Sequence, residues 1–160
     1  MRKKKTAVIS TLLAVAAVFV CSGGLCWAIS ISATGNWNET IGSSPPLAGD
    51  DLPNTCESAS NVISINITAT SGTWALTVKK IDSKWHGNLH LWIKRTSDGS
   101  GTGSISNGSS YQEVTGIDQA FFNGNGDRSG VNIQLKLTGV SIQVPPDSYM
   151  TAVYYTVSDT

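Results

Sequence analysis

Apolar and polar residues alternate along most of this 160-residue chain after position 28. Successive side chains of a β-strand point to opposite faces, so the alternation indicates strands that bury one face and expose the other. Ile63, Ile65, Ile67 and Ala69, with polar residues between them, form the clearest example. No segment shows an apolar pattern at helical spacing. The alternation predicts strands over residues 29–34, 63–69, 74–79, 89–94, 131–138, 140–144 and 149–157.

Clusters of glycine, asparagine, aspartate and proline separate the expected strands. Gly87-Asn88 and Pro145-Pro146-Asp147 are two such turn signals. Seven or eight short strands joined by turns predict an all-β fold, an antiparallel β-sandwich of immunoglobulin-like or jelly-roll type.

Two longer segments interrupt the alternation. Residues 42–55 hold three prolines and two adjacent aspartates, and we expect them to cross between the sheets. Residues 97–110 consist almost entirely of Gly, Ser, Thr and Asn, a composition typical of a flexible, exposed loop. Neither segment leaves enough chain on both sides to separate two domains, so we expect a single domain over residues 29–160.

The first 28 residues have the layout of a secretory signal peptide. A basic start at residues 2–5 precedes an apolar run over 7–20, which is short for a membrane span. The sequence favours cleavage after Ala28, with cuts after Gly23 or Gly24 as alternatives. We therefore expect a secreted or cell-surface protein, in a bacterial periplasm or outside the cell, with no membrane segment in its mature form.

Removal of residues 1–28 changes the charge of the chain. The leader holds four of the eleven basic residues and none of the eleven acidic ones, so the remaining 132 residues carry a net charge of −4. A weakly acidic surface lacks the basic footprint that binding to nucleic acid or anionic lipid requires. We expect neither as a partner.

Cleavage after Ala28 would leave Cys56 as the single cysteine. A lone thiol in an oxidising compartment is either buried and inert or paired with another chain. A cut after Gly23 or Gly24 would retain Cys26, and a Cys26–Cys56 disulfide is then the alternative.

Few residues offer metal chemistry. Asp50 and Asp51 bring two oxygen ligands together and are weak candidates for a cation site. The glycine-rich run over 98–103 supplies a single carboxylate, where a calcium loop needs several. His86 and His90 have no third ligand nearby in the sequence. We expect no metal and no other cofactor.

The sequence also lacks a recognisable catalytic set. There is no G-x-S-x-G motif, no motif that pairs the cysteine with a histidine, and no spaced pair of carboxylates. We therefore expect that the protein is not an enzyme.

Three tryptophans are candidates for a ligand site or a subunit interface. Trp92 falls on the polar side of its strand, and Trp37 and Trp85 lie beside turn residues. An exposed indole can stack on the C–H face of a sugar or pack against another subunit, and burial in the core is the alternative.

The N-terminal strand of the mature chain is the candidate assembly element. Ile29, Ile31 and Ala33 share one face of this strand. Such a strand either pairs in its own sheet, which gives a monomer, or adds to a neighbour's open edge, which gives a polymer.

The C-terminal region has the pattern of a strand, a proline-containing turn and a last strand. It resembles the C-terminal hairpin of secreted pilin-type subunits of the spore-coat-U and archaic chaperone–usher group. The resemblance implies an incomplete sandwich that the N-terminal strand of a neighbour completes. This chain departs from the group at Ser148, where glycine is usual, and lacks the usual pair of cysteines. The residues that carry the resemblance are Val144, Pro145, Tyr149, Val153, Tyr155 and Val157.

Two hypotheses for function follow. In the first, the protein is an exported structural β-sandwich, a subunit of a cell-surface filament or coat, which associates with itself or with other exported subunits by exchange of the strand 29–34. In the second, it is a monomeric secreted module that binds a glycan or another ligand through exposed tryptophans.

Overall fold

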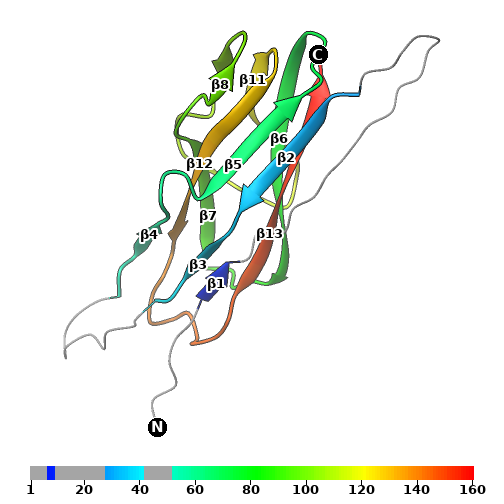
Figure 1. The fold of residues 1–160 in the computed structure, drawn as a ribbon. Coiled ribbons are helices and arrows are strands. Elements are labelled where there is room, and N and C mark those ends of the chain that lie inside the picture. The colour runs from blue at the N-terminus through cyan, green and yellow to red at the C-terminus, as the bar shows by residue number, and fades with distance from the viewer. Residues whose placement is uncertain (1–6, 10–27, 42–51) are drawn as a thin grey trace.

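The computed structural model describes residues 7–9, 28–41 and 52–160 (Figure 1). Within these residues all regular structure is β-strand. The described residues include no helix that is long and apolar enough to cross a membrane. The strands are β1 (Ala7–Ile9), β2 (Ser30–Gly35), β3 (Trp37–Glu39), β4 (Thr55–Glu57), β5 (Ile63–Thr68), β6 (Thr73–Lys84), β7 (His90–Arg95), β8 (Ser100–Gly101), β9 (Ile105–Ser106), β10 (Gln112–Glu113), β11 (Gln119–Asn125), β12 (Arg128–Thr138) and β13 (Met150–Asp159).

Two antiparallel sheets make up the fold. The larger has the order β10-β7-β12-β5-β2, with β4 and β8 also paired to β12, and the smaller has the order β13-β6-β11-β9. A separate antiparallel pair joins β1 to β3. Buried residues from both sheets form one hydrophobic core, which gives a β-sandwich-like arrangement. The prediction of an all-β, antiparallel fold is therefore confirmed.

The larger sheet is organised around β12. One edge of β12 pairs with β5 and β4, and the other edge pairs with β7 and β8. Its residues Val131, Ile133, Leu135 and Leu137 are fully buried, and the polar residues between them are half-buried on the opposite face. The predicted alternation over 131–138 is thus correct in both position and facing.

The smaller sheet contributes the largest core side chain. Trp74 on β6 is fully buried and packs edge-on against Phe122 of β11, with ring centroids 6.1 Å apart. Its indole N–H donates a hydrogen bond of 3.0 Å to the carbonyl oxygen of Gly126, which satisfies the one polar group of the ring.

The strand predicted over 140–144 is not formed, and the chain instead passes from β12 to β13 in the other sheet. Val140 and Val144 are buried, but Ile142 between them is 82% exposed. The Val144 N–H donates to the carbonyl oxygen of Ser141, so a turn spaces the two valines. The expected pairing of residues 140–144 with the last strand in a C-terminal hairpin is therefore wrong, because β13 pairs with β6.

The segment 97–110 is more structured than its composition predicts. It contains β8 and β9, and Ile105 is buried in the core. The guanidinium of Arg128, itself 7% exposed, donates to the carbonyl oxygen of Gly103. The segment is mostly exposed, as expected. It nevertheless has regular structure, and side chains from distant strands bind its backbone.

Gly139 allows the chain to turn sharply out of β12. Its φ is +82°, in the left-handed region that side-chain-bearing residues rarely adopt. A Cβ at this position would overlap the carbonyl oxygen of Asn88 in the turn between β6 and β7. The two turns therefore pack too closely for any side chain here.

We predict that Gly139→Ala lowers the free energy of unfolding by about 2 kcal/mol or more, because it combines backbone strain with a steric overlap. Urea denaturation followed by tryptophan fluorescence measures the change. Gly87→Ala is the matched control, since a Cβ at Gly87 meets no atom within 4 Å. Equal stability of the two variants would contradict the tight packing at Gly139.

Candidate functional site

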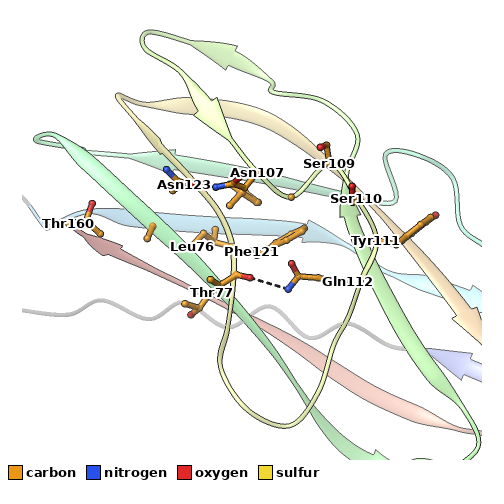
Figure 2. A pocket seen from close by; sticks show the side chains of 14 residues that line it. Leu76, Thr77, Asn107, Ser109, Ser110, Tyr111, Gln112, Phe121, Asn123 and Thr160 are labelled. Carbon is orange, nitrogen blue, oxygen red and sulfur yellow. Dashed lines mark hydrogen bonds between the residues drawn. The ribbon is translucent and has the colours of Figure 1, made fainter.

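An open groove of about 730 Å³ lies on the outer face of the four-stranded sheet (Figure 2). Its floor comes from β6 and β11, whose register places Ala75 opposite Asn123 and Thr77 opposite Ala120. Leu76, between the two β6 residues, is buried. Because neighbours along a strand face opposite ways, these four side chains point outward into the groove.

The segment 107–112, which joins β9 to β10, forms one wall of the groove. Asn107 and Gly108 both have left-handed backbone conformations, with φ values of +68° and +74°. Asparagine tolerates this region better than most residues, and glycine adopts it freely. A Cβ on Gly108 would lie 3.1 Å from the Cβ of Phe122, so glycine also lets the wall lie close against β11.

Arg95 on β7 binds the backbone of this wall. Its Nε and Nη2 atoms donate to the carbonyl oxygen of Asn107 at 3.0 and 2.8 Å, and its backbone N–H donates to the carbonyl oxygen of Gly108 at 2.6 Å. The side chain is only 9% exposed and also forms an ion pair with Asp98. The wall is therefore fixed to the larger sheet.

Two side-chain amides fix the wall to the smaller sheet as well. The Nδ2 atom of Asn107 donates to Oδ1 of Asn123 at 2.6 Å, and Nε2 of Gln112 donates to the carbonyl oxygen of Ala120 at 3.1 Å, the bond drawn in Figure 2. With Arg95, these contacts hold the wall between the two sheets.

All side chains that line the groove are uncharged. The hydroxyl groups of Ser109, Ser110 and Thr77 form no hydrogen bond with the described residues, so they are available to a ligand. Figure 2 shows the two serines on the wall above the floor. The groove thus offers neutral donors and acceptors above a floor of small side chains.

A cluster of lysine and aromatic side chains lies on the outer face of the larger sheet. The Nζ atoms of Lys94 and Lys136 lie 4.4 and 4.0 Å from the ring centroid of Tyr111, and that of Lys136 lies 5.3 Å from the Trp92 ring. Burial of the Tyr111 hydroxyl and the nearby Glu57 carboxylate raise the pKa of Tyr111 to about 12. This cluster fixes Tyr111, the residue at which the wall returns to the larger sheet.

The three candidate tryptophans do not share a site. Trp37 is 5% exposed, so for this residue the alternative of core burial holds and it is not a surface ligand or interface residue. Trp85 and Trp92 are half-buried, and Trp92 does face outward as predicted. The ammonium group of Lys80 lies over the Trp85 ring and that of Lys136 over the Trp92 ring. On the face of each ring that the lysine covers, a sugar therefore cannot stack.

The candidate assembly strand and the C-terminal strand lie at adjacent sheet edges. Ile29 and Ile31 are buried and Ala33 is partly buried against the core. Among the described strands, β2 pairs only with β5 and β13 pairs only with β6, and β2 and β13 contact each other across the two sheets (Figure 1). The predicted inward residues of the last strand are all buried, namely Tyr149, Val153, Tyr155 and Val157.

The weak metal candidates do not form a cluster. Asp50 and Asp51 lie outside the described residues. His86 packs edge-on against Tyr149, while Nδ1 of His90 lies 2.6 Å from a carboxylate oxygen of Glu113. Across residues 7–9, 28–41 and 52–160, no three His, Cys, Asp or Glu side chains are grouped to hold a metal ion.

Cys56 is half-buried on β4, and burial together with the Glu39 carboxylate raises the pKa of its thiol. Cys26, the partner of Cys56 in the alternative disulfide, lies outside the described residues.

No family model, curated protein or solved structure matches this chain. The groove was not predicted from the sequence, where Asn107-Gly108 indicates only a turn and the strand around Phe121 and Phe122 is not recognised. One sequence signal could have indicated the missing strand. Two adjacent phenylalanines follow the 97–110 segment, and large apolar side chains of this kind are usually buried.

We predict that Arg95→Met releases the groove wall while it keeps the apolar stem of the side chain. Loss of hydrogen bonds from a charged donor costs about 2 kcal/mol, so amide hydrogen exchange over residues 107–112 should accelerate roughly 30-fold. Lys79→Met, which removes an exposed ion pair between β6 and Asp118 just before β11, should leave this exchange unchanged. Equal exchange rates in the two variants would contradict the role of Arg95.

We predict that folding stability falls as pH rises from about 10 to about 12. The pKa of Tyr111 is higher in the folded protein than in the unfolded chain. As pH rises, the unfolded chain therefore loses this proton first, which lowers its free energy relative to the folded state and reduces the free energy of unfolding. In Tyr111→Phe, the free energy of unfolding measured by urea denaturation at a series of pH values should fall less steeply. The same slope against pH in both proteins would contradict the role of Tyr111.

Proposed function

We propose that this protein is an exported structural β-sandwich, a subunit of a cell-surface filament or coat whose function is assembly rather than catalysis. In this proposal residues 1–28, which include β1, direct export and are then removed. The mature chain begins at Ile29 and associates with other copies, or with other exported subunits, by exchange of its N-terminal strand.

The position of β2 carries the proposal. β2 is six residues long, lies at the edge of its sheet and is bonded to β5 alone among the described strands. An edge strand near the start of a chain can leave its sheet without breaking the pairing of any other strand. The slot it vacates is shaped for an alternating strand, because it receives the buried side chains of Ile29 and Ile31.

Exchange between copies replaces each lost contact with an identical one. A neighbour's β2 would form the same ladder with β5, so the net free-energy difference reduces to hinge strain and association entropy. Gly35 ends β2 with a φ of +127°, and a Cβ there would overlap the carbonyl oxygen of Val62. Gly35 is the hinge in this proposal, because glycine can adopt backbone conformations that other residues rarely adopt, both with β2 in its own sheet and with β2 in a neighbour's sheet.

The adjacent edge supports assembly of more than two copies. β13 is ten residues long and leaves one edge unpaired by the described strands. An open edge accepts a further strand through main-chain hydrogen bonds, with selectivity supplied by the alternating side chains. Head-to-tail exchange that does not close on itself gives a filament.

A disulfide across β2 and β5 tests which chain supplies β2. Thr34 and Ser64 lie opposite each other in the ladder, so Thr34→Cys with Ser64→Cys, in a Cys56→Ala background, can link the two strands. We predict that protein recovered after export gives a ladder of covalent multimers on a non-reducing denaturing gel, and that reduction collapses it to monomer.

The matched control places the cysteine pair where no exchange is proposed. Thr77 and Thr156 lie opposite each other in the β6–β13 ladder, and Thr77→Cys with Thr156→Cys should give a monomer band only. A single monomer band from the Thr34 and Ser64 variant, at concentrations that assemble the parent protein, would show that β2 stays in its own sheet and would refute the proposal.

A further inference from the structure

We propose that the groove between β6, β11 and the 107–112 wall binds a neutral saccharide. Its volume of about 730 Å³ falls within the range of about 300 to 1,000 Å³ that small-molecule sites occupy. The site lies on a different sheet from the exchanged strand β2.

The chemistry of the lining selects the ligand class. A sugar hydroxyl both donates and accepts, and its best partners are side chains that do the same: asparagine, glutamine, serine and threonine. The groove is lined by these residue types and by apolar residues, and by no charged side chain. An anionic ligand would find no counter-charge in the lining, whereas a neutral polyhydroxylated one would find donors and acceptors for its hydroxyl groups.

The internal hydrogen bonds of the site leave defined groups free. Oδ1 of Asn123 accepts from Asn107, so the Asn123 amide retains its two N–H donors and Oδ1 of Asn107 remains an acceptor. Ser109 and Ser110 add two hydroxyl groups on the wall. A carbonyl oxygen and two hydroxyls on the wall, with an amide on the floor beside it, can donate to and accept from the vicinal hydroxyls of a pyranose ring.

The floor supplies the apolar contact that a sugar ring needs. Ala75 and Ala120 face outward between the polar groups, and with Phe121 they supply apolar lining against which the C–H face of a ring can lie. This differs from tryptophan stacking, because here the apolar area comes from residues of the sheet itself.

The wall is ordered before any ligand arrives. Arg95, Asn107 and Gln112 bind it to both sheets, so a ligand would not need to order a loop. Preorganisation of this kind raises affinity by lowering the entropy lost on binding.

Saturation-transfer difference NMR on the full chain, exported with its leader, tests the inference. The probes are maltose, cellobiose, lactose and N,N′-diacetylchitobiose, with glucuronate as the anionic comparator. We expect saturation transfer to at least one neutral disaccharide and none to glucuronate. Absence of transfer to all four neutral probes, or equal transfer to glucuronate, would overturn the inference.

Two variants place the binding in the groove. Ser109→Ala with Ser110→Ala removes two free hydroxyls and should weaken binding about tenfold, and Ala75→Phe fills the floor and should abolish it. The control, Ser30→Ala with Thr68→Ala, removes an opposed pair of hydroxyls from the other sheet and should bind as the parent does. Circular dichroism verifies the fold of each variant, and undiminished binding to Ala75→Phe would overturn the assignment of the site.

Discussion

The register of β12 is the constraint on which the rest of this structure depends. Because β12 is paired along both edges, it fixes the positions of β4, β5, β7 and β8 at once, and through β5 the position of β2. A shift by one residue would turn its four fully buried residues to solvent and bring its polar residues into the core. Even the groove on the other sheet depends on it, since Arg95 at the end of β7 holds the groove wall.

The sequence predicts those parts of the fold in which local pattern and tertiary environment agree. Ile63, Ile65 and Ile67 alternate with polar residues and are buried as expected, because a half-buried strand leaves a period of two. The same rule misled over residues 140–144, where a turn brings Val140 and Val144 inward and leaves Ile142 exposed. The spacing of apolar residues alone cannot distinguish a strand from a turn in which buried and exposed residues happen to alternate.

The candidate site could not be predicted in the same way, because its structure depends on contacts between distant residues. The order of the 97–110 segment comes from Arg95 and Arg128, which bind backbone carbonyl groups, and a carbonyl has no sequence signature. Composition therefore indicated a flexible loop. Likewise, Trp37 follows a glycine and an asparagine, which suit a turn, yet its ring is buried.

The groove and β2 lie on different sheets, and this separation would matter in a filament. Exchange of β2 would leave the groove uncovered, so every subunit would display one site at a regular interval. In that arrangement the proposed saccharide site would recur on linked copies, and linkage raises the effective concentration of each site to about the millimolar range. A filament of such subunits would hold a polysaccharide or a glycan-covered surface through avidity, with no single site needing high affinity.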